Sequence, residues 1–214
     1  MRAIDDLVAD TFDISLTQMM ENAGRSLAEL AIDWYVPETA TVLVGPGHNG
    51  GGGLVGARHL ANRGVHVAVV VADETSLKLT TQRQLRVARA MGIEVLDEPR
   101  AASVVIDALF GYALAGEPRG PAASLIDWAN AQPSPVIALD VPSGLDASSG
   151  RVNAHCVRAS VTMTLALAKT GLRGAEAVTG DVVLADISVP RAAYRALGLE
   201  VPELFTTSPL VSLW

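Results

Sequence analysis

The chain has 214 residues, 50% of them hydrophobic and 4% aromatic, and a formal net charge of −7. This composition supports one sizeable core, and the acidic balance argues against nucleic-acid binding, because neutralising phosphates requires clustered Lys and Arg. No apolar run reaches the roughly 18 to 20 residues of a spanning helix, and the acidic N-terminus is unlike a signal peptide, so we expect a cytoplasmic protein with no membrane role.

Two amphipathic helices are predicted before the first strand. Apolar residues recur at helical spacing from Ile4 to Thr11 and again from Met20 to Trp34, and Pro37 ends the second series. We therefore divide a single expected domain into two N-terminal helices over residues 1–36, a core over residues 41–190 and a C-terminal tail over residues 191–214.

A glycine-rich segment follows the first predicted strand, Thr41–Val44. Six glycines lie between Gly45 and Gly53, and a helical pattern begins at Leu54. We expect an open loop over a helix N-terminus, where unpaired N–H groups attract a phosphate and glycine permits close approach and positive φ. The glycines at its first, third and sixth positions satisfy G-x-G-x-x-G, and the alternative is a tight turn that binds no ligand.

Strands and helices alternate through the rest of the core. This pattern predicts a parallel sheet with helices on both faces. Asp73 lies beyond Gly50 at the distance where a dinucleotide-binding fold places its ribose-binding acid, but acids are common at strand ends and we favour a cap of the helix predicted over residues 76–91. The predicted strands cover residues 65–71, 93–96, 102–109, 136–139, 159–167 and 181–187, and the predicted helices cover residues 76–91 and 122–130, with a short last helix starting at Pro190.

Two of these strands end in carboxylates, Asp107 and Asp140. Ligands of an open α/β sheet bind beyond the carboxyl ends of its strands, where the loops over residues 45–53, 107–120 and 140–146 should converge. Two acids in one partly buried pocket repel, which raises one pKa and creates a proton donor unless a bound cation keeps both ionised. Either arrangement suits acid–base chemistry on a phosphorylated small molecule, and the alternative for each acid is a helix or turn cap.

Five short segments carry a family resemblance. They are MENAGR at residues 20–25, GPGHNGGGGLVGARHL at 45–60, VIDALFG at 105–111, RG at 119–120 and DVPSGLDASSG at 140–150. Together they resemble, in this order, the NAD(P)H-hydrate epimerase family, also called YjeF N-terminal domains. The resemblance implies a Rossmann-like three-layer αβα sandwich with a mostly parallel central sheet, and an isomerase that interconverts the R and S forms of hydrated NADH and NADPH. It further implies a free-standing homodimer whose companion is a separate NAD(P)H-hydrate dehydratase.

The same resemblance assigns site residues. Asp140 is implied to bind substrate and to act as the catalytic acid and then base. Such an acid assists C–O cleavage at the hydroxyl-bearing carbon, and water returns on the other face of the ring. No organic cofactor is implied, because the hydrated dinucleotide is itself the substrate. The implied substrate loops are His48, Asn49, Gly50, Gly51 and Gly52, and Gly111, Tyr112, Ala113, Leu114, Ala115, Gly116 and Glu117; the implied potassium ligands are Asn49, Asp107 and Ser143.

The chain departs from the family pattern at Gly52, where the family has Asp. If that carboxylate contacts substrate, its loss costs about 1.5–3 kcal/mol, or one to two decades in rate. A second hypothesis is therefore a family member with impaired turnover that acts as a nucleotide- or protein-binding module. A third is an NAD-linked oxidoreductase that uses G-x-G-x-x-G and Asp73, although no hydride-transfer residue is visible.

Overall fold

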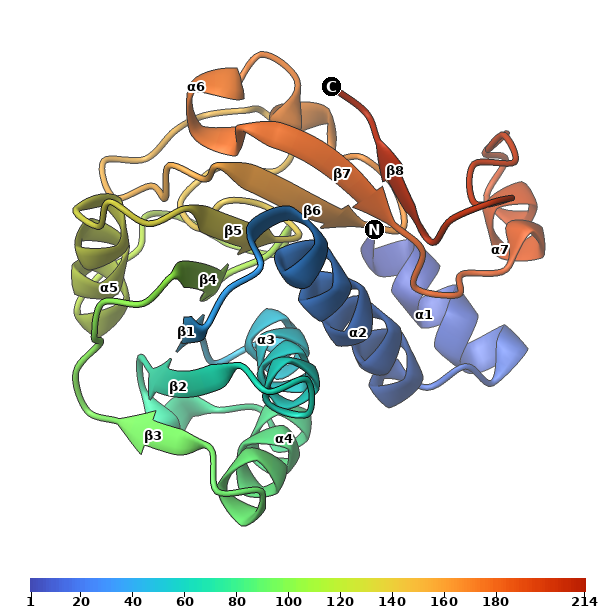
Figure 1. The fold of residues 1–214 in the computed structure, drawn as a ribbon. Coiled ribbons are helices and arrows are strands. Elements are labelled where there is room, and N and C mark those ends of the chain that lie inside the picture. The colour runs from blue at the N-terminus through green and yellow to red at the C-terminus, as the bar shows by residue number, and fades with distance from the viewer.

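The strands of the computed structural model, which describes residues 1–214, form one eight-stranded sheet (Figure 1). Its spatial order is β3-β2-β1-β4-β5-β6-β7-β8, and every neighbouring pair is parallel except β7 and β8. This confirms the predicted mostly parallel sheet. The strands are β1 (Thr39–Val44), β2 (His66–Val71), β3 (Glu94–Leu96), β4 (Val104–Ala108), β5 (Val136–Leu139), β6 (Val161–Leu165), β7 (Asp181–Ala185) and β8 (Leu210–Ser212).

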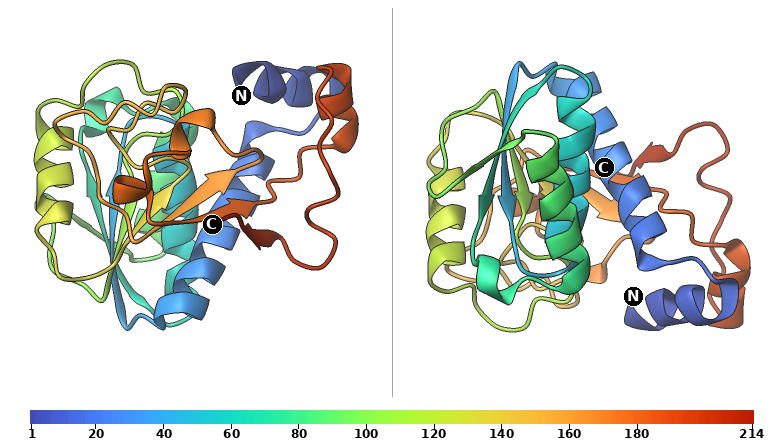
Figure 2. Two further views of the ribbon diagram at one scale, coloured as in Figure 1. Left: turned by 90° about the horizontal axis from the view of Figure 1, so that it is seen from above. Right: turned by 90° about the horizontal axis from the view of Figure 1, so that it is seen from below.

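The helices cover both faces of the sheet. Seen along the sheet, α5 covers one face, whereas α2, α3 and α4 cover the other, which confirms the three-layer fold (Figure 2). The two predicted N-terminal helices are α1 and α2, and α1 lies with α7 beside the layers rather than within them. The helices are α1 (Arg2–Phe12), α2 (Leu16–Tyr35), α3 (His48–Ala61), α4 (Leu79–Ala90), α5 (Pro121–Asn130), α6 (Glu176–Thr179) and α7 (Arg191–Ala196).

Local sequence explains where α2 begins and what it buries. The Ser15 hydroxyl accepts a hydrogen bond from the Gln18 amide at 3.3 Å, and the Gln18 side chain accepts one from the Ser15 amide at 2.8 Å. This capping box satisfies backbone donors that would otherwise be unpaired at the helix start. Farther along, Leu27 and Leu30 are fully buried in the main hydrophobic core, where α2 packs on α3.

The glycine-rich segment is not the open loop that its composition predicts. Helix α3 begins at His48, so the glycines at positions 50–53 lie in its first two turns, and none of them has positive φ. Close packing explains them instead. A Cβ on Gly50 would lie 2.1 Å from the Gly45 carbonyl oxygen, and one on Gly53 would lie 2.3 Å from the Ala108 Cβ. Glycine here lets the backbone of α3 approach other backbone and the sheet.

The strand order places three loops at one edge. From β1 the chain adds β2 and β3 on one side of the sheet, and from β4 it adds β5 and β6 on the other side, so the order in which strands are added reverses between β1 and β4. Ligands of doubly wound sheets bind beyond the carboxyl ends of the strands at such a point. The predicted convergence of the loops after β1, β4 and β5 follows from this order.

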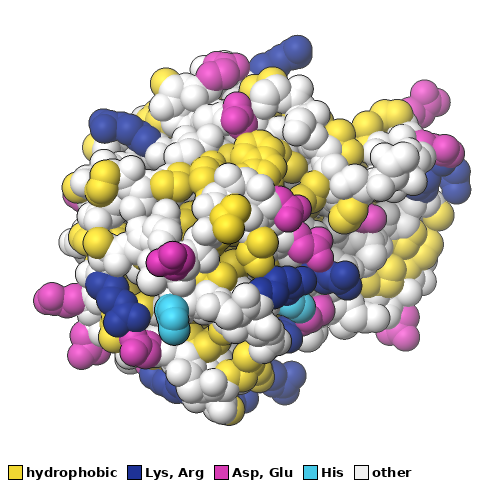
Figure 3. Space-filling view, viewed as in Figure 1, with side chains coloured by type: hydrophobic (Ala, Val, Ile, Leu, Met, Phe, Trp, Pro, Cys, Tyr) yellow, Lys and Arg dark blue, Asp and Glu magenta, His cyan; other side chains and the backbone are white.

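The surface carries charges of both signs. On the face shown in Figure 3, Lys and Arg side chains are separated by acidic and apolar ones and form no continuous basic patch. None of the helices combines the length and the apolar character needed to cross a membrane.

Candidate active site

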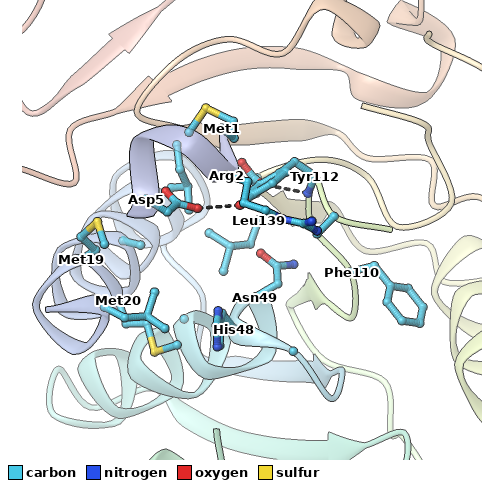
Figure 4. Close-up of a pocket in the computed structure, with 18 of the residues that line it drawn as sticks. Met1, Arg2, Asp5, Met19, Met20, His48, Asn49, Phe110, Tyr112 and Leu139 are labelled. Carbon is cyan, nitrogen blue, oxygen red and sulfur yellow. Dashed lines mark hydrogen bonds between the residues drawn. The ribbon is translucent and has the colours of Figure 1, made fainter. Parts of the chain in front are cut away.

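A cavity of about 670 Å³ opens at the carboxyl edge of the sheet. Its walls come from α1, α2, the start of α3, the loop after β4 and the end of β5 (Figure 4). This volume lies in the range of about 300–1,000 Å³ that is usual for small-molecule sites. The residues that were predicted from the sequence and line it are His48, Asn49, Gly52, Gly111, Tyr112, Ala113, Leu114, Ala115 and Asp140.

Asp140 follows directly after β5 and is 3% exposed. Its φ is +73°, in the left-handed region, and its amide donates to the Met163 carbonyl of β6 at 2.8 Å. A non-glycine residue in this region is strained by about 1–3 kcal/mol, and such residues cluster at functional sites. The neighbouring strand therefore holds Asp140 in a conformation that an isolated chain would disfavour.

Lys169 is the counter-charge of Asp140, and both side chains are about 5% exposed or less. Its ammonium forms an ion pair with Asp140 Oδ1, and it also donates to the Leu165 carbonyl at 2.7 Å and to Thr164 Oγ1 at 3.2 Å. The ammonium therefore has a counter-charge and two hydrogen-bond acceptors, the condition under which a buried charge is tolerated. No role for Lys169 was predicted from the sequence. Its position just after a buried strand is the one feature of the sequence that could have indicated a place at the site.

Asp107, at the end of β4, is fully buried and does not line the cavity. Its carboxylate accepts from the Ser143 amide at 2.8 Å, the Ser143 hydroxyl at 2.6 Å and the Leu109 amide at 3.1 Å. Burial raises the pKa of Asp107 to about 6. The expected repulsion between Asp107 and Asp140 is not the cause of this shift, which arises from desolvation of the buried carboxyl, and Asp140 is paired with Lys169 instead.

The predicted potassium ligands are partly assembled. Asp107 and Ser143 are in direct contact, whereas Asn49 lies on the cavity side, and no hydrogen bond joins it to either of them. The Asn49 Nδ2 atom is buried without a partner. Carboxylate, hydroxyl and amide oxygens are the donors that hard cations prefer, and Asp107 has no basic side chain paired with it. The types of donor therefore suit a hard cation such as potassium, which stays a prediction.

The predicted substrate residues separate into two groups. His48, Asn49 and Gly52 line the cavity, whereas Gly50 and Gly51 do not. Gly50 abuts Gly45, and a Cβ on Gly51 would lie 2.9 Å from the Met20 thioether. In the second loop the lining residues are Gly111, Tyr112, Ala113, Leu114 and Ala115, whereas Gly116 and Glu117 lie outside the cavity.

Asp73 does not belong to this site. It caps the short 3₁₀ turn Glu74–Ser76, where its carboxylate accepts from the Thr75 amide at 3.0 Å and the Thr75 hydroxyl at 2.7 Å. Asp73 is therefore a cap, but of this turn and not of the helix predicted over residues 76–91, which begins at Leu79. The oxidoreductase hypothesis required Asp73 to bind the ribose of a dinucleotide, and Asp73 does not line the cavity.

The fold and its cavity define a Rossmann-like α/β protein with a candidate ligand site at the edge of the sheet where the strand order reverses. The chain belongs to the family described as YjeF-related protein N-terminus, whose model matches residues 16–171. It is also similar in fold to the crystal structure of a yeast protein, ynu0, with a TM-score of 0.86 and 24% identity over 98% of this chain and 96% of that one.

Relatives with two different names match most of this chain. An NAD(P)H-hydrate epimerase of Dehalogenimonas lykanthroporepellens is 44% identical over 208 residues, covering 94% of this chain and 84% of the relative. A bifunctional NAD(P)H-hydrate repair enzyme Nnr of Salinibacter ruber is 37% identical over 89% of this chain. The chain spans only 40% of that second relative.

Proposed function

We propose that this protein is an NAD(P)H-hydrate epimerase, an isomerase that interconverts the R and S forms of hydrated NADH and NADPH. The observation that carries the proposal is the buried Asp140–Lys169 pair on the wall of a cavity of about 670 Å³. The 44% identity to a relative named as such an epimerase supports it. The test is enzyme-dependent conversion of the purified R form into the S form, followed by chromatography in potassium buffer at near-neutral pH.

The chemistry requires two proton transfers, both at the oxygen attached to one ring carbon. The hydroxyl on the hydrated ring leaves as water when it is protonated, and the ring nitrogen stabilises the resulting cation. Water then adds to the other face and releases a proton. We assign both transfers to Asp140, with the Lys169 ammonium beside it as its counter-charge, because general acid–base catalysis requires a group within hydrogen-bond reach of the proton.

Asn49, Asp107 and Ser143 are the residues that we propose to hold potassium. The ion would supply positive charge behind the wall of the cavity and would balance the buried Asp107 carboxylate. No step of the chemistry above depends on it.

Potassium is expected to stabilise the fold. At ten times its dissociation constant, an ion that binds only the native state adds about 1.4 kcal/mol, which raises Tm by about 3–5 °C for a chain of this size. Thermal unfolding in potassium chloride and in choline chloride at equal ionic strength measures this difference. Asp107→Asn should abolish the difference, whereas Asp97→Asn, which changes charge equally at an exposed position, should retain it. Equal Tm values in both salts would remove potassium from the proposal.

The role of Gly52 is testable because a single flexible side chain limits a substitution there. A Cβ would lie 3.0 Å from Leu139 Cδ2, a tight contact that requires the leucine to shift by a few tenths of an ångström, and both residues line the cavity. For an active epimerase we expect Gly52→Asp to change kcat/KM by less than about threefold, because the Asp140–Lys169 pair is already complete. A gain of one to two decades would instead support the impaired family member. Gly52→Ala isolates the effect of the Cβ from that of the carboxylate.

Two further parts of the proposal concern partners. The substrate is a small dinucleotide, and a separate hydrate dehydratase is the proposed companion; the name of the bifunctional relatives fits two linked activities in one repair process. The homodimer that the family resemblance implies stays a prediction.

A further inference from the structure

The N-terminal helix contributes a polar group to the cavity. Ile4 and Val8 are buried in a small hydrophobic cluster with residues of α2 and α7, which fixes α1 on the body of the protein. The opposite side of α1 lines the cavity, and there the Asp5 carboxylate accepts a hydrogen bond from the Tyr112 hydroxyl at 2.5 Å (Figure 4). The first helix is thus joined to the loop that follows β4.

Tyr112 forms hydrogen bonds through both its side-chain hydroxyl and its backbone amide. While its hydroxyl donates to Asp5, its backbone amide donates to Asp140 Oδ2 at 2.8 Å. One residue therefore connects a carboxylate on α1 with the carboxylate that we place in the chemistry. Burial and the neighbouring Asp5 carboxylate raise the pKa of the Tyr112 phenol, so the hydroxyl remains a donor at neutral pH.

The rest of this loop is lightly held. Its other hydrogen bonds are from the Leu114 amide to the Gly111 carbonyl at 3.1 Å and from the Asn153 side chain to the Gly116 carbonyl at 3.3 Å. Ala113, Ala115, Gly116 and Glu117 are exposed. Few buried contacts and exposed backbone are features of segments that open locally at low free energy. The two hydrogen bonds of Tyr112, together with the packing of its side chain against the hydrophobic cluster that contains Leu145 and Leu172, are consequently the main restraints on the loop beside Asp140.

We propose that Asp5 is a positioning residue for the site: by holding the Tyr112 hydroxyl, it keeps the loop over residues 111–117 in the conformation in which the Tyr112 amide bonds to Asp140. This inference rests on the proposed function for its kinetic consequence but not for its structural one. Without Asp5, Tyr112 loses its outer anchor, and the amide is in place beside Asp140 for only part of the time. The consequence is a lower kcat rather than weaker substrate binding.

The experiment compares Asp5→Ala, Tyr112→Phe and the double variant with the wild type. Each single variant should lower kcat about tenfold with KM changed less than twofold. The kcat of the double variant should equal that of the less active single variant, because both substitutions remove the same interaction. Asp5→Asn, which retains an acceptor oxygen, should recover most of the loss. Asp10→Ala removes an exposed carboxylate from the same helix and serves as the matched control.

Backbone hydrogen exchange over residues 111–117 gives a second reading that requires no activity. Exchange should be several-fold faster in Asp5→Ala and Tyr112→Phe than in the wild type, with exchange in β5 unchanged. Unchanged exchange, additive losses in the double variant, or an effect on KM alone would overturn the proposal. If the wild type does not epimerise the hydrate, the proposed function fails, and hydrogen exchange alone decides whether Asp5 positions the loop.

Discussion

Asp140→Asn is expected to lower kcat for epimerisation by about 10²–10⁴-fold, because general acid–base catalysis contributes this much and an amide cannot exchange the proton. The substitution preserves the shape of the side chain and leaves one oxygen that can accept a hydrogen bond from the Tyr112 amide. In the wild type this amide donates to Asp140 Oδ2 at 2.8 Å. The measurement follows the appearance of the S form from the R form of hydrated NADPH, with the spontaneous rate subtracted.

The kinetic comparison requires that the wild type and each variant be folded. Asp140→Asn leaves the Lys169 ammonium without its counter-charge, so circular dichroism and a melting curve should accompany the kinetics. Asp97→Asn, at an exposed position, gives the control for loss of a carboxylate. Well-folded wild type that does not exceed the spontaneous rate would contradict the epimerase proposal and favour the nucleotide- or protein-binding module.

The strands and the acids that end them were predictable because both signals are local. The run of β2 after His66 is apolar and consists of valines apart from Ala68, which is typical of a parallel strand buried on both faces. Since parallel strands bring their carboxyl ends to one edge, the positions of Asp107 and Asp140 in the chain place them there too. The three-residue β8 was missed because so short a strand has no periodicity and depends on pairing with β7.

The glycine-rich segment was misread for a physical reason. Glycine serves equally where a ligand approaches the backbone and where another element does. The sequence does not distinguish these cases, because the atoms that exclude a side chain, the Gly45 carbonyl and the Ala108 Cβ, are brought near Gly50 and Gly53 only by the fold. Helix α3 therefore begins six residues earlier than the pattern from Leu54 predicted, at His48.

Residues that act through distant partners were the least predictable. Asp5 has the local signature of an acid in the first turn of a helix, which the helix dipole favours without any partner. Its bond to Tyr112 joins residues 107 positions apart. Lys169 likewise contacts Asp140 only because β5 and β6 are neighbours.

Lys169→Met is expected to reduce the free energy of unfolding by about 3–5 kcal/mol, because it leaves the Asp140 carboxylate buried without a counter-charge. Met retains most of the volume of the lysine stem, so an empty cavity does not explain the loss. Urea denaturation measures it, provided that the m-value is unchanged. Arg25→Met provides the contrast, because Arg25 pairs with Glu29 at the surface, where such a pair contributes about 0.3–0.5 kcal/mol.

The double variant Asp140→Asn/Lys169→Met separates the charge from the packing. Because it removes both charges, it should recover much of the stability lost in Lys169→Met, since a buried ion pair and a neutral pair of similar volume are often equally stable. It should nevertheless lack activity, because neither remaining side chain can exchange a proton. Additive destabilisation in the double variant would show that the two side chains contribute through packing alone. Recovery of stability without recovery of turnover would mean that the pair is retained for chemistry rather than for the fold.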